Sequence, residues 1–174
     1  QLAGRDLLDY TGAAWYHREV DVPEAWDGRV IRLAFGAADY LTRAWVNGVL
    51  VGEHEGGYTP FAFDVTAHVK PGGTNHLVVR VYDPRDHGEV PHGMQGSHFT
   101  RVSGIWQSVK LEARPQVFLA EVGVRAHLNP DRLEVKVALN VPADGHLIRA
   151  IVTDAAGREV VAGEVVQNGL EASL

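Results

Sequence analysis

The chain has 174 residues, of which 45% are hydrophobic, and it carries a formal net charge of −6 at pH 7. This length accommodates one large domain or two small ones, and the hydrophobic content permits a packed core. The acidic balance argues against a nucleic-acid surface, which needs a basic stripe, and no apolar run approaches the roughly 20 residues of a membrane span. The chain contains no cysteine, which excludes disulfides and thiolate metal sites but leaves the cellular compartment open.

The beginning of the chain leaves its processing undecided. It starts at Gln1 with neither a methionine nor a charged and apolar leader. A removed signal peptide and a cut piece of a longer protein therefore both stay open.

Alternating apolar and polar residues predict β-strands throughout the first two thirds of the chain. Between residues 41 and 54, the pair Asn47-Gly48 separates two such runs and favours a type I′ hairpin turn, because both central residues must adopt positive φ. The predicted strands cover residues 15–22, 30–35, 41–46, 49–54, 61–65, 76–82 and 105–112.

The segment from Asp83 to Ser103 breaks this pattern. It has almost no apolar period, and it contains three glycines, two prolines and three histidines. A loop of about 20 residues inside a compact domain is usually explained by function or by disorder. This loop is therefore the best candidate for a functional site.

Beyond the boundary expected at Arg114-Pro115, four further runs rich in valine predict strands over residues 117–127, 133–141, 147–154 and 159–166. No segment shows a helical period of useful length, so the whole chain is predicted to be all-β and to form β-sandwiches. The final residues, 168–174, are predicted to be a loop or a truncated end.

Three motifs carry a family resemblance when taken in order. They are WYHREVDVP from Trp15, WVNGVLVGEHEGGYTPFAFDVT from Trp45, and SGIWQSVKLE from Ser103. Together they resemble the sugar-binding jelly-roll domain at the N-terminus of glycoside hydrolase family 2 enzymes, the β-galactosidase and β-glucuronidase group. The resemblance implies a jelly-roll domain over residues 1–115. It also implies an immunoglobulin-like sandwich over 116–174, incomplete because about seven strands are needed and about four are predicted.

The resemblance also implies retaining hydrolysis by two glutamates on a later (β/α)₈ barrel, the acid/base following an asparagine. No asparagine of this chain precedes a glutamate, and no βαβ succession is present. Glu53 and Glu55 are expected to be solvated edge carboxylates. We therefore expect the non-catalytic, sugar-binding and scaffolding portion of a β-glycosidase, without the barrel that would make it an enzyme.

The resemblance places the sugar subsite on the loop before Ser103, with Asp83, Arg85, His98 and Arg101 as candidate residues. The β-galactosidase and β-glucuronidase forms have a substrate-contacting aspartate where this chain has His98. The run FTRVSGIWQ resembles the form of another subgroup. Arg101 could bind sugar hydroxyls, pair with a barrel carboxylate, or tie the loop to Asp83 or Asp86.

Two alternative functions belong to different classes of protein: a free-standing carbohydrate-binding module, and a protein-interaction sandwich without a sugar site.

We expect no cofactor and no metal, because the spacing of His87, His92 and His98 matches no common zinc pattern. The expected partners are a β-glycoside and a downstream catalytic domain, with homo-oligomerisation of the complete enzyme as an option. Core or interdomain packing is expected for the indoles of Trp15, Trp45 and Trp106 in preference to stacking on sugar.

Overall fold

The computed structural model describes residues 12–84, 102–129, 131–166, 169 and 171–173. It divides the chain into two compact units, one ending at Arg114 and one beginning at Pro115. The candidate residues Arg85, His98 and Arg101 lie outside the described residues, as do His87, His92 and Asp86.

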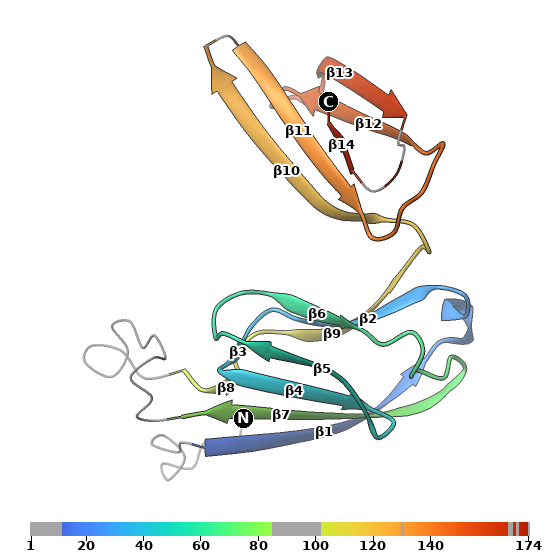
Figure 1. The fold of residues 1–174 in the computed structure, drawn as a ribbon, viewed down its shortest axis with the longest axis vertical. Coiled ribbons are helices and arrows are strands. Elements are labelled where there is room, and N and C mark those ends of the chain that lie inside the picture. Colours follow the sequence, from blue (N-terminus) through green and yellow to red (C-terminus); the bar gives the residue numbers. More distant parts are fainter. Residues whose placement is uncertain (1–11, 85–101, 130, 167–168, 170, 174) are drawn as a thin grey trace, which may run out of the picture. The chain divides into compact units, whose positions relative to one another are not determined.

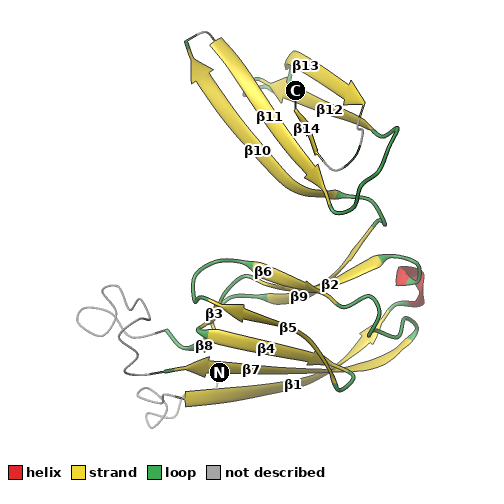
Figure 2. Ribbon diagram, viewed as in Figure 1, coloured by secondary structure: helices red, strands yellow, loops and turns green. Residues whose placement is uncertain are grey.

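The first unit contains an antiparallel four-stranded sheet in the order β1-β7-β4-β5 (Figures 1 and 2). Its longest pairing joins β1 to β7, with Gly12 opposite Asp83 and Val22 opposite Gly73. The strands are β1 (Gly12–Val22), β7 (Gly73–Asp83), β4 (Leu41–Val46) and β5 (Val49–Glu55).

A three-stranded antiparallel sheet in the order β6-β2-β9 forms the second layer of this unit. A short 3-10 helix, η2 (Glu24–Trp26), connects β1 to β2, and a two-stranded pair, β3 with β8, lies in the same unit. The strands are β6 (Phe61–Asp64), β2 (Val30–Phe35), β9 (Val109–Arg114), β3 (Ala38–Asp39) and β8 (Gly104–Ile105).

The core lies between these two sheets. Every second residue of β2 faces it, so Ile31, Leu33 and Phe35 are each at most 2% exposed. Val46 of β4 and Val81 of β7 approach from the other sheet and are equally buried. Because each strand buries alternate side chains, the hydrophobic alternation of the sequence becomes the interior of a sandwich.

The hairpin of β4 and β5 closes as predicted. Asn47 has φ 51° and Gly48 has φ 85°, so both central residues adopt the positive φ of a type I′ turn. The pairing shifts register between Ala44 and Trp45, which marks a β-bulge.

The second unit contains two groups of strands. β10, β11 and β14 form one antiparallel sheet, and β12 pairs with β13 in a hairpin. These strands are β10 (Leu119–Leu128), β11 (Asp131–Leu139), β12 (Leu147–Thr153), β13 (Glu159–Val166) and β14 (Glu171–Ser173). Of the two alternatives predicted for residues 168–174, the loop is wrong for Glu171–Ser173, which form β14 and pair with β11 from Lys136 to Ala138.

The predicted all-β fold class is confirmed. The only helix among the described residues is η2, and none of them forms a helix long and apolar enough to cross a membrane. The single strand predicted over residues 105–112 is wrong in its first half. The structure instead has β8 and β9, separated by Trp106–Ser108, because the indole of Trp106 leaves the strand to bond the backbone of another loop.

Candidate functional site

The segment proposed as a site loop is anchored at both of its ends. Asp83, the last residue of β7, is only 3% exposed, and its carboxylate accepts a hydrogen bond from the hydroxyl of Ser103. This bond holds the start and the end of the segment together at one end of the sandwich. Of the four candidate residues, the structure describes Asp83 alone, and it gives this carboxylate a buried anchoring contact.

Trp106 joins this end of the sandwich to the loop after β5. Its indole Nε1 donates a hydrogen bond to the carbonyl of Gly57 at 2.8 Å, and its ring meets Tyr58 edge-on with centroids 5.9 Å apart. Tyr58 is 51% exposed and Trp106 is 40% exposed. The expectation that Trp106 packs in a core is therefore not met within this unit, because nearly half of its surface reaches solvent.

Gly57 has a steric role here. A Cβ on this residue would lie 2.4 Å from the Oδ1 of Asp39, so only glycine allows the loop to approach this carboxyl group. Asp39 is 8% exposed and ends β3, which pairs with Gly104 of β8. The Asp39–Tyr40 peptide bond is cis. The loop carrying Tyr58 and the strand carrying Gly104 thus meet at one buried aspartate.

Tyr40 and Glu55 form a second polar pair close to Asp39 in the chain. The Tyr40 hydroxyl donates to Glu55 Oε1 at 2.9 Å. This hydrogen bond, followed by burial and the negative charges of Glu55 and Asp39, raises the pKa of the Tyr40 phenol above its usual value. The hydroxyl therefore stays protonated and acts as a donor at neutral pH.

Gly104 packs against β1. Its φ is +74°, and a Cβ there would lie 2.4 Å from the Tyr16 hydroxyl oxygen, so both conformation and space require glycine. The same hydroxyl accepts a hydrogen bond from the Ile105 amide at 3.3 Å. The Ser-Gly-Ile-Trp motif thus contacts three parts of the first unit: Ser103 bonds the end of β7, Gly104 and Ile105 both contact Tyr16 of β1, and Trp106 bonds the loop after β5.

The two glutamates considered as carboxylates of interest are both engaged on the surface. Glu53 pairs with Arg43, and Glu55 accepts the Tyr40 hydrogen bond. The prediction of solvated edge carboxylates describes their exposure correctly. Sequence reasoning missed their partners, because cross-strand pairs depend on a register that the hairpin turn sets.

One group of side chains in the described part of the chain could hold a metal ion. His17, Glu19 and His76 are exposed on the outer face of the four-stranded sheet, and their ligand atoms lie within 4.8 Å of one another. His76 Nδ1 is 3.5 Å from Glu19 Oε1, which also suits an ordinary ion pair. Sequence spacing could not find this group, because β1 and β7 bring it together from distant positions.

The same outer face carries exposed aromatic rings. Trp15 is 62% exposed and stacks on Trp45 with ring centroids 5.6 Å apart. The guanidinium of Arg80 lies 6.0 Å from the Trp15 ring centroid and 5.2 Å from that of Tyr82. Of the two kinds of packing predicted for Trp15, core packing is wrong, because this side chain lies on the face that the second sheet does not cover. Interdomain packing stays a prediction.

Two antiparallel sheets packed around one core define the first unit as a β-sandwich, an architecture that includes the jelly rolls. Residues 2–115 match the family model described as "Glycosyl hydrolases family 2, sugar binding domain". The chain therefore belongs to glycosyl hydrolase family 2, as the sequence motifs indicated.

Relatives and solved structures agree with this assignment. A β-galactosidase of Thermoanaerobacter pseudethanolicus is 29% identical over 91% of this chain and 20% of its own length. A β-glucuronidase of Canis lupus familiaris is 28% identical over 96% of this chain and 29% of its own length. The structure of a β-glucuronidase from Ruminococcus gnavus in complex with D-glucuronic acid covers 94% of the chain with a TM-score of 0.74 at 25% identity, and the chain covers 30% of it. This chain thus spans less than a third of the length of each.

Proposed function

We propose that this chain is the non-catalytic, sugar-binding and scaffolding portion of a β-glycosidase that retains anomeric configuration, with a β-glycoside as the substrate of the complete protein. The match of residues 2–115 to the sugar-binding domain of the family carries this proposal. It is supported by the absence of any Asn-Glu pair and by the all-β content of the described residues, which leave the two carboxylates of hydrolysis to another part of the protein.

Within that function, the segment between Asp83 and Ser103 supplies part of a sugar subsite, with Arg85, His98 and Arg101 as its polar groups. The support is the anchoring of both segment ends, since a loop with fixed ends can place side chains reproducibly. Asp83 holds the base of the loop. Its burial and its bond to Ser103 suit this role better than direct contact with sugar.

Residues 116–174 form part of an immunoglobulin-like sandwich that the rest of the protein completes. Their strands bury few side chains: among the described hydrophobic residues of this unit, the buried ones are Val137 and Leu139, which are 4% and 6% exposed. Such a small interior is what a partial sandwich would show.

A free-standing carbohydrate-binding module is the second candidate. The exposed indole of Trp15 and the exposed pair Tyr58 and Trp106 favour it, because flat aromatic faces pack against sugar rings. Affinity of the isolated chain for β-glycosides, lost in Trp15→Ala or in Trp106→Ala, would support the module. No measurable affinity would favour the scaffolding role.

The deciding experiment compares hydrolysis of aryl β-glycosides by the isolated chain and by the complete protein. We expect turnover only from the complete protein. In that protein Arg101→Ala should lower kcat/KM by about 10- to 150-fold, the equivalent of roughly 1.5–3 kcal/mol for a lost hydrogen bond to a charged group. Arg43→Ala, which removes a surface ion pair with Glu53, serves as the matched control and should leave kcat/KM unchanged.

Two results would contradict this function. Turnover by the isolated chain that disappears when one of its own carboxylates is mutated would make the chain itself catalytic. A complete protein in which Arg101→Ala destabilises folding and leaves kcat/KM intact would make Arg101 a structural tether.

A further inference from the structure

The two sheets of the first unit have different numbers of strands, and one edge of the smaller sheet has no described pairing partner. Four strands face three, and β9 is the outermost strand of the smaller sheet. β9 pairs with β2 on one side, and no described strand pairs with its other side. β1 is an outermost strand of the larger sheet, and its residues line a common groove with those of β9.

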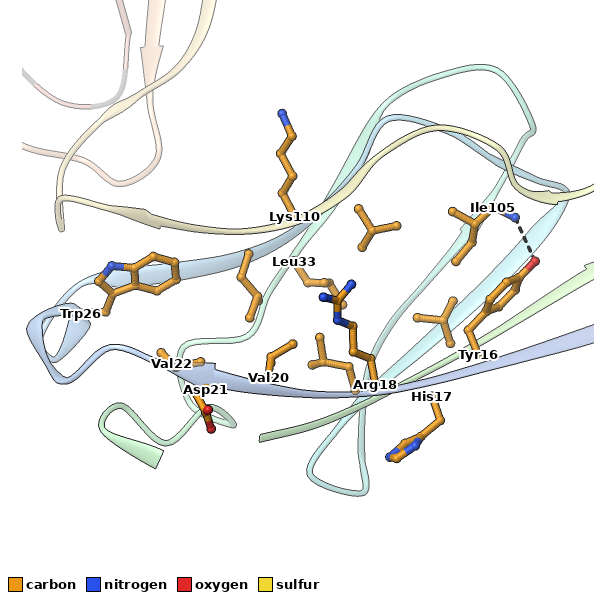
Figure 3. Close-up of a pocket in the computed structure, with 14 residues that line it drawn as sticks. Tyr16, His17, Arg18, Val20, Asp21, Val22, Trp26, Leu33, Ile105 and Lys110 are labelled. Carbon is orange, nitrogen blue, oxygen red and sulfur yellow. Dashed lines mark hydrogen bonds between the residues drawn. The ribbon is translucent and has the colours of Figure 1, made fainter. Parts of the chain in front are cut away.

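A groove of about 510 Å³ lies between these two edges (Figure 3). Most of the side chains that line it lie on the inward faces of the two sheets. Val109 is opposite the buried Phe35 yet is 38% exposed, and Tyr16, on the same face of β1 as the buried Val22, is 39% exposed. Every second residue of both edge strands therefore faces the sandwich interior, and the described strands do not cover these side chains.

Arg18 adds a charge to this apolar lining. It shares the inward face of β1 with Tyr16 and Val20, and its side chain extends into the groove in Figure 3. Within the described part of the protein, its guanidinium has neither a hydrogen bond nor an ion pair. An arginine on the inner face of a sandwich needs an acceptor once that face is covered.

We propose that a further β-strand, contributed by a part of the same protein outside these 174 residues, pairs with the free edge of β9 and fills the groove. Its inward side chains would be apolar, apart from one carboxylate or amide oxygen facing Arg18. About six residues suffice, since β9 has the six residues Val109–Arg114 and a strand extends roughly 3.3 Å per residue.

Two observations favour a strand of the same protein over other occupants. The chain spans only 18–29% of the length of the relatives it matches, so most of their length lies elsewhere. An exposed edge with an apolar flank is also an aggregation hazard that proteins cover within their own fold. This proposal rests on the proposed function, because both require a protein longer than these 174 residues.

Thiol labelling can test this proposal, because the chain contains no cysteine. Val109→Cys places a thiol on the groove face of β9. Lys110 also borders the groove, but its side chain points away from it in Figure 3, so Lys110→Cys is the matched control on the outward face of the same strand. Reaction with a chromogenic disulfide reagent is measured in the 174-residue chain and in the complete protein. We expect the rate at position 109 to fall at least tenfold in the complete protein, and the rate at position 110 to stay within about twofold.

Each other outcome overturns the proposal. Equal rates at position 109 in both proteins would mean that the groove is not filled. Equal slowing at both positions would mean that a whole domain covers the strand. Slow labelling at position 109 already in the 174-residue chain would assign the groove to residues 1–11 or, if gel filtration shows a dimer, to a second copy. Hydrolysis of aryl β-glycosides by the same proteins reports separately on the proposed function.

Discussion

Asn75 shows how a single buried amide can organise several turns. It is 0% exposed, yet both ends of its side chain are fully bonded. Its Oδ1 accepts from the Lys70 amide and from Asn47 Nδ2, each at 2.8 Å, and its Nδ2 donates to the carbonyls of Lys70 and Gly73 at 3.0 and 2.9 Å. This one side chain therefore joins the β4–β5 turn to the turn that precedes β7.

Asn75→Ala should lower the free energy of unfolding of the first unit by about 3 kcal/mol. The substitution leaves several buried groups without partners, and each buried unsatisfied group costs about 1–3 kcal/mol. Urea denaturation of both proteins measures this difference. Thr74→Ala, which removes an exposed hydroxyl bonded to Asp21, is the neighbouring control and should cost less than about 1 kcal/mol. Similar losses in the two variants would show that the Asn75 network contributes little.

His54 makes the stability of the first unit depend on pH. Its ring stacks on Phe61 with centroids 3.9 Å apart, and burial lowers the pKa of this imidazole below its usual value. The unfolded chain then binds a proton more readily than the folded chain. Stability is therefore complete above the unfolded pKa of about 6.5, and it declines as the pH falls through the folded pKa.

We expect the Tm of the 174-residue chain to fall more steeply between pH 7 and pH 5 than the Tm of the His54→Gln variant. Differential scanning calorimetry at half-unit intervals measures both curves. The remaining histidines are common to the two proteins, so the difference isolates His54. Parallel curves would contradict the assignment of this pH dependence to His54.

In the β4–β5 hairpin, two glycines contribute to stability for different reasons. Gly48 has φ +85°, and a Cβ at this position would meet no atom within 4 Å. Any cost of a side chain there is therefore backbone strain rather than a clash. By contrast, a Cβ at Gly52 of β5 would lie 2.2 Å from the Phe63 ring, so that glycine is required for packing.

Gly48→Val should destabilise the first unit by about 1–3 kcal/mol, because a β-branched residue at positive φ is strained. Gly48→Asn is the matched control and should cost less than about 1 kcal/mol, since asparagine tolerates this conformation. Thermal unfolding followed by circular dichroism compares the three proteins. A valine variant as stable as the asparagine variant would contradict the type I′ turn.

At the scale of the whole molecule, the two units differ in how much apolar surface they bury. The first unit has a cluster of twelve buried hydrophobic residues. In the second unit several large side chains are more than half exposed, among them Val122 at 57%, Val124 at 63%, Leu147 at 61% and Val160 at 67%. A unit with so little interior has little hydrophobic stabilisation.

Limited proteolysis of the 174-residue chain with thermolysin should therefore cut within residues 115–174 before it cuts within residues 12–83. Local opening is most frequent where few apolar contacts are buried. Mass spectrometry of the early fragments identifies the order of cleavage. Early cleavage inside β2 or β4, with the second unit intact, would reverse the stability order inferred from burial.

The sequence by itself determined the features that depend on neighbours in the chain. Alternation indicated every described strand of four or more residues to within four residues at either end, the largest error being the start of β9. The Asn47-Gly48 pair indicated the hairpin turn, and the ordered motifs indicated the family. Residues near in the chain suffice for these inferences because strand period and turn conformation are local properties.

Only the tertiary structure decided which faces are covered and which distant groups meet. Trp15 and Tyr16 are neighbours with equally plausible strand patterns, yet one lies on the outer face and the other lines the groove. The break between β8 and β9 follows from the bond of Trp106 to Gly57, 49 residues away. Burial and long-range hydrogen bonds depend on how two sheets stack, and a period of two in the sequence is the same whichever face the second sheet covers.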